Sequence, residues 1–189
     1  MNQNVIDDLR AFDWQTIVEY GNSLDDLNDA QWRFVKGLAI ELCIEKHCNS
    51  DLVYVGIKHK DFDWPRHNVS VELKSQLSGG MYGKRGGLSK TYTLKLNNSH
   101  GTNRQNTLNP SDVADVIIVV RDDGAFAIDR DTAVRNAKAG GDGFEVRVPK
   151  NEIVELSGLV VPDRTFDTGL NEKILTAIRD SLPSTKQSR

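Results

Sequence analysis

The chain has few cysteines and no long apolar run, and each absence excludes a class of protein. Its 189 residues include only two cysteines, too few for the disulfide framework of a small secreted domain. No second Cys/His pair joins Cys43, His47 and Cys48 to complete a tetrahedral zinc set, so we expect both cysteines to be buried helix residues. No segment has the apolar length of a membrane span, and residues 1–8 lack the pattern of a signal peptide. We therefore expect a cytoplasmic protein that does not contact a membrane.

Acidic residues are missing from a long internal stretch. Residues 75–111 contain no Asp or Glu, although the net charge of the chain is −3. Residues 1–30, by contrast, carry seven acidic residues against Arg10 alone. The basic residues of the stretch are Lys84, Arg85, Lys90, Lys95 and Arg104, with His100 besides. A solvated loop normally mixes both signs of charge, so this one-sided segment is the footprint expected for binding a nucleic-acid backbone.

The composition is that of an ordinary globular domain, with 27% charged and 38% hydrophobic residues. A chain of 189 residues is long enough to bury a core in one domain. We expect an α/β (α+β) fold with a mixed central sheet of about five strands flanked by helices. The single domain, 1–189, divides into N-terminal helices (1–48), a hairpin with basic loops and core strands (52–128), a C-terminal helix/strand/helix segment (129–183) and a tail (184–189).

Apolar periodicity indicates the elements of this fold. Period 3.6 predicts helices over 4–20, 29–47, 131–138 and 170–182. Alternation or apolar runs predict strands over 51–60, 68–76, 91–96, 113–120, 125–128, 144–148 and 156–161. The run 113–120 is almost continuously apolar, which predicts a strand buried on both faces. We expect the strand 68–76 to be central.

Residues 68–76 alternate strictly between apolar and polar side chains, which is typical of a strand with one buried face. Val69, Val71 and Leu73 form the apolar face. The polar face carries, in order, Asn68, Ser70, Glu72, Lys74 and Gln76. This segment is the most informative part of the chain, because it places a carboxylate and an ammonium group next to each other on one strand.

Two further acids, Asp61 and Asp63, precede Pro65, which cannot continue a paired strand. A turn near Pro65 brings one of the two aspartates beside Glu72. Two carboxylates suit Mg²⁺, which takes oxygen ligands and keeps positions for water and substrate phosphate. Lys74 next to them can orient or deprotonate an attacking water. The plain alternative is that Glu72 and Lys74 form only a surface ion pair.

The predicted helix 29–47 carries a further acid that is relevant to this site. Glu41 and Glu45 lie one turn apart on it. Either both are solvated, or one of them reaches the carboxylates of the hairpin.

Two polar loops follow the strand. Residues 77–90 are rich in glycine and basic residues, but lack the spacing of a P-loop. Residues 97–106 are rich in Asn, Gln and Arg, the side chains that read adenine and guanine edges, although ordinary loop polarity explains them equally well. The candidate DNA-binding residues are Tyr82, Lys84, Arg85, Lys90, Lys95, Asn97, Asn98, His100, Asn103, Arg104, Gln105 and Asn106.

A helix glutamate, an aspartate before the bend of a hairpin and Glu-x-Lys on its second strand together resemble the PD-(D/E)xK nuclease superfamily. Polar loops after the motif and coverage of the whole chain by one domain look most like a type II restriction endonuclease. The resemblance implies catalytic Asp63, Glu72 and Lys74, with Mg²⁺ held by Asp63, Glu72 and the Leu73 carbonyl. Supporting positions are Asp61, Glu41, Ser70 and Gln76. Here proline follows the acid, whereas the family places it before, so the choice between Asp61 and Asp63 stays open.

The same resemblance implies a homodimer that cuts both strands of a short palindromic site in double-stranded DNA and leaves 5′-phosphate ends. Three alternatives remain. A repair, mismatch or junction-resolving nuclease shares the same core. A non-catalytic DNA-binding protein on this fold keeps the basic loops without metal-dependent chemistry. In an unrelated α/β enzyme, Glu72 and Lys74 have no role in catalysis.

Overall fold

The computed structural model describes residues 1–24, 33–47, 52–57, 60–76, 91–97, 108–121, 124–140 and 143–157. Over these residues the chain has a mixed α+β architecture, in agreement with the expected class. The predicted helix over 170–182, the tail 184–189 and most of the two basic loops lie outside them. In the part of the chain that is described, no helix is long and apolar enough to cross a membrane.

Within the described residues the strands form two sheets. The larger is six-stranded, in the order β1-β2-β3-β5-β6-β9, and is mixed, because β3 and β5 run parallel while all other neighbours are antiparallel. Its strands are β1 (Val53–Ile57), β2 (Lys60–Trp64), β3 (Val69–Gln76), β5 (Val116–Arg121), β6 (Gly124–Asp129) and β9 (Val154–Glu155). The smaller sheet has the order β4-β8-β7 and consists of β4 (Thr91–Asn97), β8 (Gly143–Pro149) and β7 (Ala137–Gly140). The prediction of about five strands in one sheet was therefore too simple.

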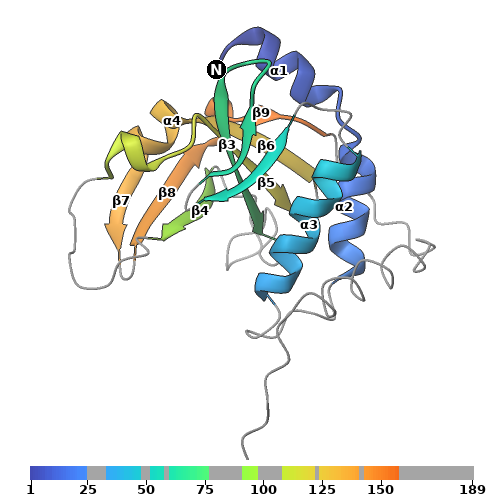
Figure 1. Cartoon of the computed structure of the whole chain (residues 1–189). Helices are drawn as coiled ribbons and strands as arrows, with labels where there is room; N and C mark the ends of the chain where they lie inside the picture. The colour runs from blue at the N-terminus through green and yellow to red at the C-terminus, as the bar shows by residue number, and fades with distance from the viewer. Residues whose placement is uncertain are drawn as a thin grey trace, which may run out of the picture.

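Helices cover one face of the large sheet, and the small sheet covers the other (Figure 1). The helical layer consists of α1 (Gln3–Arg10), α2 (Trp14–Ser23) and α3 (Arg33–His47). The layer of the small sheet also contains α4 (Arg130–Arg135) and the short 3₁₀ turns η2 (Pro110–Asp112) and η3 (Lys150–Glu152). The large sheet is thus the middle layer of the described part of the chain.

Strand β5 is buried on both faces, as its apolar run predicted. Val116, Ile118 and Val120 join the core beneath the helices, whereas Ile117 and Val119 join the core beneath the small sheet. Burial on both faces is what permits an uninterrupted apolar sequence. The strand that carries Glu72 and Lys74, β3, pairs with β5 from Val71 to Gln76 and lies inside the sheet, as predicted.

Several element boundaries differ from the predictions. The predicted helix 4–20 is two helices, because Asp13 caps α2 by accepting a hydrogen bond from Thr16 N–H at 3.1 Å. The predicted strand 51–60 ends at Ile57, and Lys60 begins β2. The predicted helix 131–138 ends at Arg135.

The C-terminal part of that predicted helix is the strand β7, which pairs antiparallel with β8. Pairing with a neighbouring strand, which a local pattern does not contain, overrides the helical periodicity here. The strand predicted at 156–161 is not observed over its two described residues: β9 covers Val154–Glu155, and Leu156 and Ser157 lie outside it. Residues beyond 157 lie outside the description.

Candidate active site

A hairpin of β2 and β3 carries the candidate site. Its turn begins directly after Trp64, where Pro65 was expected to end the strand, and His67 N–H donates to the Trp64 carbonyl at 3.1 Å. Asn68 has a positive φ of 52°, a conformation that asparagine tolerates better than most residues. The local sequence therefore suffices to form this turn.

The two strands of the hairpin bury one face and present polar groups on the other. Phe62, Trp64, Val71 and Leu73 belong to the core beneath the helices. The acids of β2 alternate with its aromatic residues, so they belong to the opposite face of the strand. The predicted apolar face of β3 is confirmed by the burial of Val71 and Leu73.

The register places Asp61, rather than Asp63, next to the Glu-x-Lys motif. Phe62 pairs with Val71 and Asp63 with Ser70, so Asp61 stands beside Glu72 at the end of the paired segment. The Leu73 N–H donates to Oδ2 of Asp61 at 2.5 Å. Asp63 is exposed and lies further towards the turn. Of the two aspartates that the sequence left open, Asp61 has the position suited to a ligand.

Glu72 and Lys74 form an ion pair between Oε1 and Nζ. Their exposures differ sharply: the Glu72 side chain is 3% exposed and that of Lys74 is 28% exposed. A buried carboxylate is stable only when it is paired or hydrogen-bonded. The pair is therefore not a solvated surface contact, and its lysine end remains accessible to solvent.

Helix α3 adds a third carboxylate, that of Glu41. Burial and the negative charge of Asp61 raise the pKa of Glu41 to about 7, against the opposing effects of a hydrogen bond from Tyr54 and the charge of Lys74. Glu41 is therefore within electrostatic range of both the hairpin aspartate and the lysine of the motif. Of the two helix glutamates, Glu45 is exposed. Of the two glutamates, Glu41 is therefore the candidate, and its part in the site stays a prediction.

Ser70 is committed to a different contact from the predicted one. Its N–H and hydroxyl both donate to Oδ2 of Asp115 at 2.8 Å, and Asp115 N–H donates back to the hydroxyl at 3.1 Å. Oδ1 of Asp115 pairs with Arg130 at 2.8 Å. These hydrogen bonds join the start of β3 to the residue before β5, so Ser70 has a structural role between the two strands.

Sequence reasoning missed two residues here, Tyr54 and Asp115. Tyr54 lies opposite Phe62 in the β1–β2 register, and its position follows only from that pairing. Asp115 was not recognised, because it lies within the apolar run that predicted the strand 113–120. A polar residue directly before a fully buried strand was the one available signal.

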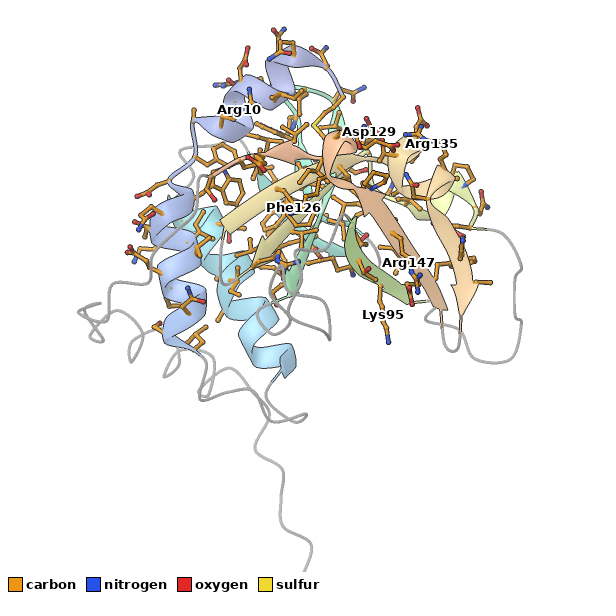
Figure 2. The ribbon with its side chains drawn as sticks, turned by 180° about the vertical axis from the view of Figure 1, so that it is seen from behind. Arg10, Lys95, Phe126, Asp129, Arg135 and Arg147 are labelled. Carbon is orange, nitrogen blue, oxygen red and sulfur yellow. The ribbon has the colours of Figure 1, made fainter. Side chains whose placement is uncertain are left out.

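The predicted DNA-binding residues are mostly beyond the described part of the chain. Lys95 is described, and it is an exposed residue of β4 (Figure 2). Asn97 ends β4 and Gln76 ends β3, but the directions of their side chains are not described. The other residues outside the description are Tyr82, Lys84, Arg85, Lys90, Asn98, His100, Asn103, Arg104, Gln105 and Asn106.

The donor set at the end of the hairpin fits Mg²⁺ in its chemistry. Mg²⁺ typically takes one or two protein carboxylates and completes its shell with water and phosphate oxygens. Asp61 and Glu72 supply two carboxylates, and Leu73, which follows Glu72 in the chain, adds a backbone carbonyl. Among the described residues, no three His, Cys, Asp or Glu side chains form a preformed metal cluster. A site of two carboxylates and a carbonyl does not require one.

Comparison of the chain with protein-family models, curated proteins and solved structures produced no match in any of the three.

Proposed function

We propose that this chain is a Mg²⁺-dependent endonuclease that hydrolyses phosphodiester bonds of double-stranded DNA. One observation carries the proposal: Asp61 and Glu72 are adjacent across the hairpin, and Lys74 is ion-paired to the buried Glu72. The resemblance to the PD-(D/E)xK superfamily supports the same assignment. We further propose the type II restriction class, acting as a homodimer on a short palindromic site.

Asp61, Glu72 and the Leu73 carbonyl would hold Mg²⁺. When bound, Mg²⁺ supplies stabilisation of the negative charge that develops on the phosphate. Glu72 also holds the ammonium group of Lys74 through their ion pair. Because Lys74 is partly exposed, its ammonium group can orient a water for attack on the phosphorus. Lys95 and the basic segment would hold the DNA backbone.

The core beneath the hairpin supports this chemistry by keeping the groups in place. Leu73, between the two motif residues, is only 6% exposed, and the Glu72 and Lys74 backbones pair with Ile117 and Val119 of β5. Side chains on a strand held from both sides lose little further freedom when the substrate binds. The motif residues are therefore pre-organised by the sheet.

The test is incubation of the purified protein with long duplex DNA of many sequences, with and without Mg²⁺, followed by gel electrophoresis. We expect discrete DNA fragments only when Mg²⁺ is present. Sequencing of the fragment ends then gives the recognition site and the cleavage stagger. A smear would contradict site specificity and would favour a non-specific or repair nuclease. DNA that is retarded on a native gel but remains intact would contradict catalysis.

Lys74→Ala is the decisive variant for the mechanism. We expect cleavage to fall by about 10²- to 10³-fold, the usual cost of removing one group that stabilises the transition state, while DNA binding is retained. Lys46→Ala is the matched control, because Lys46 is an exposed lysine of α3 that the proposal does not use. Normal cleavage by Lys74→Ala would overturn the assignment of the lysine.

A further inference from the structure

The small sheet has an outer face, of which the catalytic proposal uses only Lys95. The inner side chains of β4 and β8, such as Leu94, Phe144 and Val146, are buried in the core between the two sheets. Side chains that alternate with them along the strands belong to the opposite, outer face. The outer face carries Thr93 and Lys95 on β4, Glu145 and Arg147 on β8, and Lys138 on β7.

The strand register places three cations around one acid on this face. Lys95 of β4 and Lys138 of β7 stand opposite Glu145 from its two sides. Arg147 follows two residues later on β8 and forms an ion pair with Glu145 (Figure 2 labels Lys95 and Arg147). One carboxylate does not balance three cations, so the described residues of the face carry an excess of positive charge.

The cations of this face are available to a ligand. Within the described part of the chain, neither Lys95 nor Lys138 has an ion-pair partner, and both are exposed. The pair of Arg147 and Glu145 is itself accessible, with side chains 62% and 33% exposed. An exposed ion pair contributes little to stability, so Arg147 can exchange the carboxylate for an external anion at low cost.

The spacing of the two lysines suits a phosphate backbone. Lys95 and Lys138 are separated by two strand spacings, which is about 10 Å. Duplex DNA carries one negative charge for about every 1.7 Å of its axis, so several phosphates lie within that span. Each lysine can therefore meet a phosphate of its own. The described residues of the face include no apolar side chain that could enter a lipid layer, which argues against a membrane as the ligand.

The face also lies on the side of the molecule where DNA is needed. Glu72 and Lys74 pair with Ile117 and Val119, which belong to the core beneath the small sheet. The motif residues therefore share one side of the large sheet with the small sheet, whereas the helices α1 to α3 cover the other side. In the sequence, β4 belongs to the stretch 75–111 that contains no acid.

We infer that the outer face of the small sheet binds the phosphate backbone of duplex DNA through Lys95, Lys138 and Arg147. Glu145 opposes this binding, because it repels phosphate and competes for Arg147. The inference rests on the proposed function, since it takes double-stranded DNA as the ligand. It adds a surface outside the candidate active site that contacts the backbone and does not read the sequence.

The test measures binding of the full chain to labelled duplexes of unrelated sequence by fluorescence anisotropy, in EDTA and over a range of salt concentration. We expect Lys138→Ala to weaken binding a few-fold on every duplex and to reduce the slope of log K against log salt by about 0.9, the effect of one lost phosphate contact. Lys95→Ala and Arg147→Ala should do the same. The matched control is Lys46→Ala, an exposed lysine of α3 in the helical layer, which should leave the slope unchanged.

Glu145→Gln gives a result of opposite sign, which misfolding does not produce. We expect it to tighten binding a few-fold, because Arg147 is released and the nearest negative charge is gone. Glu155→Gln is its control: Glu155 is an exposed acid of β9 in the large sheet, and its replacement changes the net charge equally. Unchanged salt slopes in the three cation variants, or equal effects of the two glutamate variants, would overturn the inference.

Two further measurements separate this inference from the others. DNA binding that depends on Lys138 in a protein that does not cleave DNA with Mg²⁺ supports the inference and contradicts the nuclease. Cleavage by the wild type, with DNA affinity unchanged in Lys138→Ala, supports the nuclease and contradicts the inference. Vesicles of phosphatidylserine and phosphatidylcholine are the second probe, and a loss in Lys138→Ala that affects vesicle binding but not DNA binding would identify a lipid surface instead.

Discussion

Oδ2 of Asp61 accepts a hydrogen bond of 2.5 Å from the backbone N–H of Leu73, the residue between Glu72 and Lys74. The carboxylate of β2 thus binds the backbone of β3 where the paired register ends. Strand residues direct N–H and C=O to the same neighbour, so the Leu73 carbonyl also belongs to the Asp61 side. This contact is the reason to prefer Asp61 over Asp63 as the ligand.

The two aspartates therefore form a matched pair for mutagenesis. We expect Asp61→Asn to lower cleavage by at least about 100-fold, because it removes a charge from the cation site. Asp63→Asn, on the same strand and exposed, should stay within a few-fold of the wild type. Initial cleavage rates at saturating Mg²⁺ measure both, and a larger loss in Asp63→Asn would reverse the assignment.

Glu72→Ala removes a buried carboxylate and leaves Lys74 without its ion-pair partner. We expect loss of cleavage that a higher Mg²⁺ concentration does not restore, since both the ligand and the group that positions the lysine are gone. The measurement is a cleavage titration with Mg²⁺. Full recovery at high Mg²⁺ would show that the cation is held by other residues.

Gly56→Ala tests the turn between β1 and β2 without changing a polar group. The substitution places a Cβ 3.2 Å from atoms of Tyr54 at a φ of +58°. We expect a loss of roughly 1 kcal/mol or more in the free energy of unfolding. Urea denaturation measures the effect.

Gly37→Ala, on α3, is the control for this substitution. Nothing lies within 4 Å of an added Cβ there, and alanine favours helix. It should not destabilise the protein. Equal losses in both variants would mean that the contact between Gly56 and Tyr54 has no special role.

The ionised carboxylate of Asp115 should make the free energy of unfolding depend on pH in the acidic range. Partial burial acts to raise the pKa of this carboxyl, but the hydrogen bonds from Ser70 and the charges of Arg130 and Lys60 outweigh it, so the pKa lies below its ordinary value of 3.8. A group with a lowered folded pKa contributes stability above its unfolded pKa and loses that contribution as the pH falls through the folded value. Stability from Asp115 is therefore complete at neutral pH and is lost in acid.

Asp115→Asn should remove this part of the pH dependence. We expect a loss of roughly 1–3 kcal/mol at neutral pH, because the buried Ser70 loses its charged acceptor, and a smaller difference from the wild type in acid. Urea unfolding over a range of acidic to neutral pH measures the effect. A difference between the two proteins that does not depend on pH would contradict the role of the ionised carboxylate.

The sequence predicted those elements in which a local pattern of apolar residues indicates which side chains are buried. Strand β3 alternates, β5 is uniformly apolar and the turn after Trp64 has its proline and asparagine, so all three were found close to their observed bounds. The division of the first helix and the strand β7 were missed. The first helix is divided because Asp13 caps α2, and β7 is a strand because it pairs with β8. Helical periodicity in the sequence shows neither contact.

The sequence determined which side chains of β3 share a face, because the period of a strand is set by its backbone. Alternation along this one strand is therefore enough to place Glu72 and Lys74 together. Only the tertiary structure decided which aspartate stands beside them and which helix glutamate comes within electrostatic range of Asp61 and Lys74. These choices depend on the register between strands and on the packing of α3 against the sheet. Both are settled by contacts between residues distant in the chain, so a local pattern does not contain them.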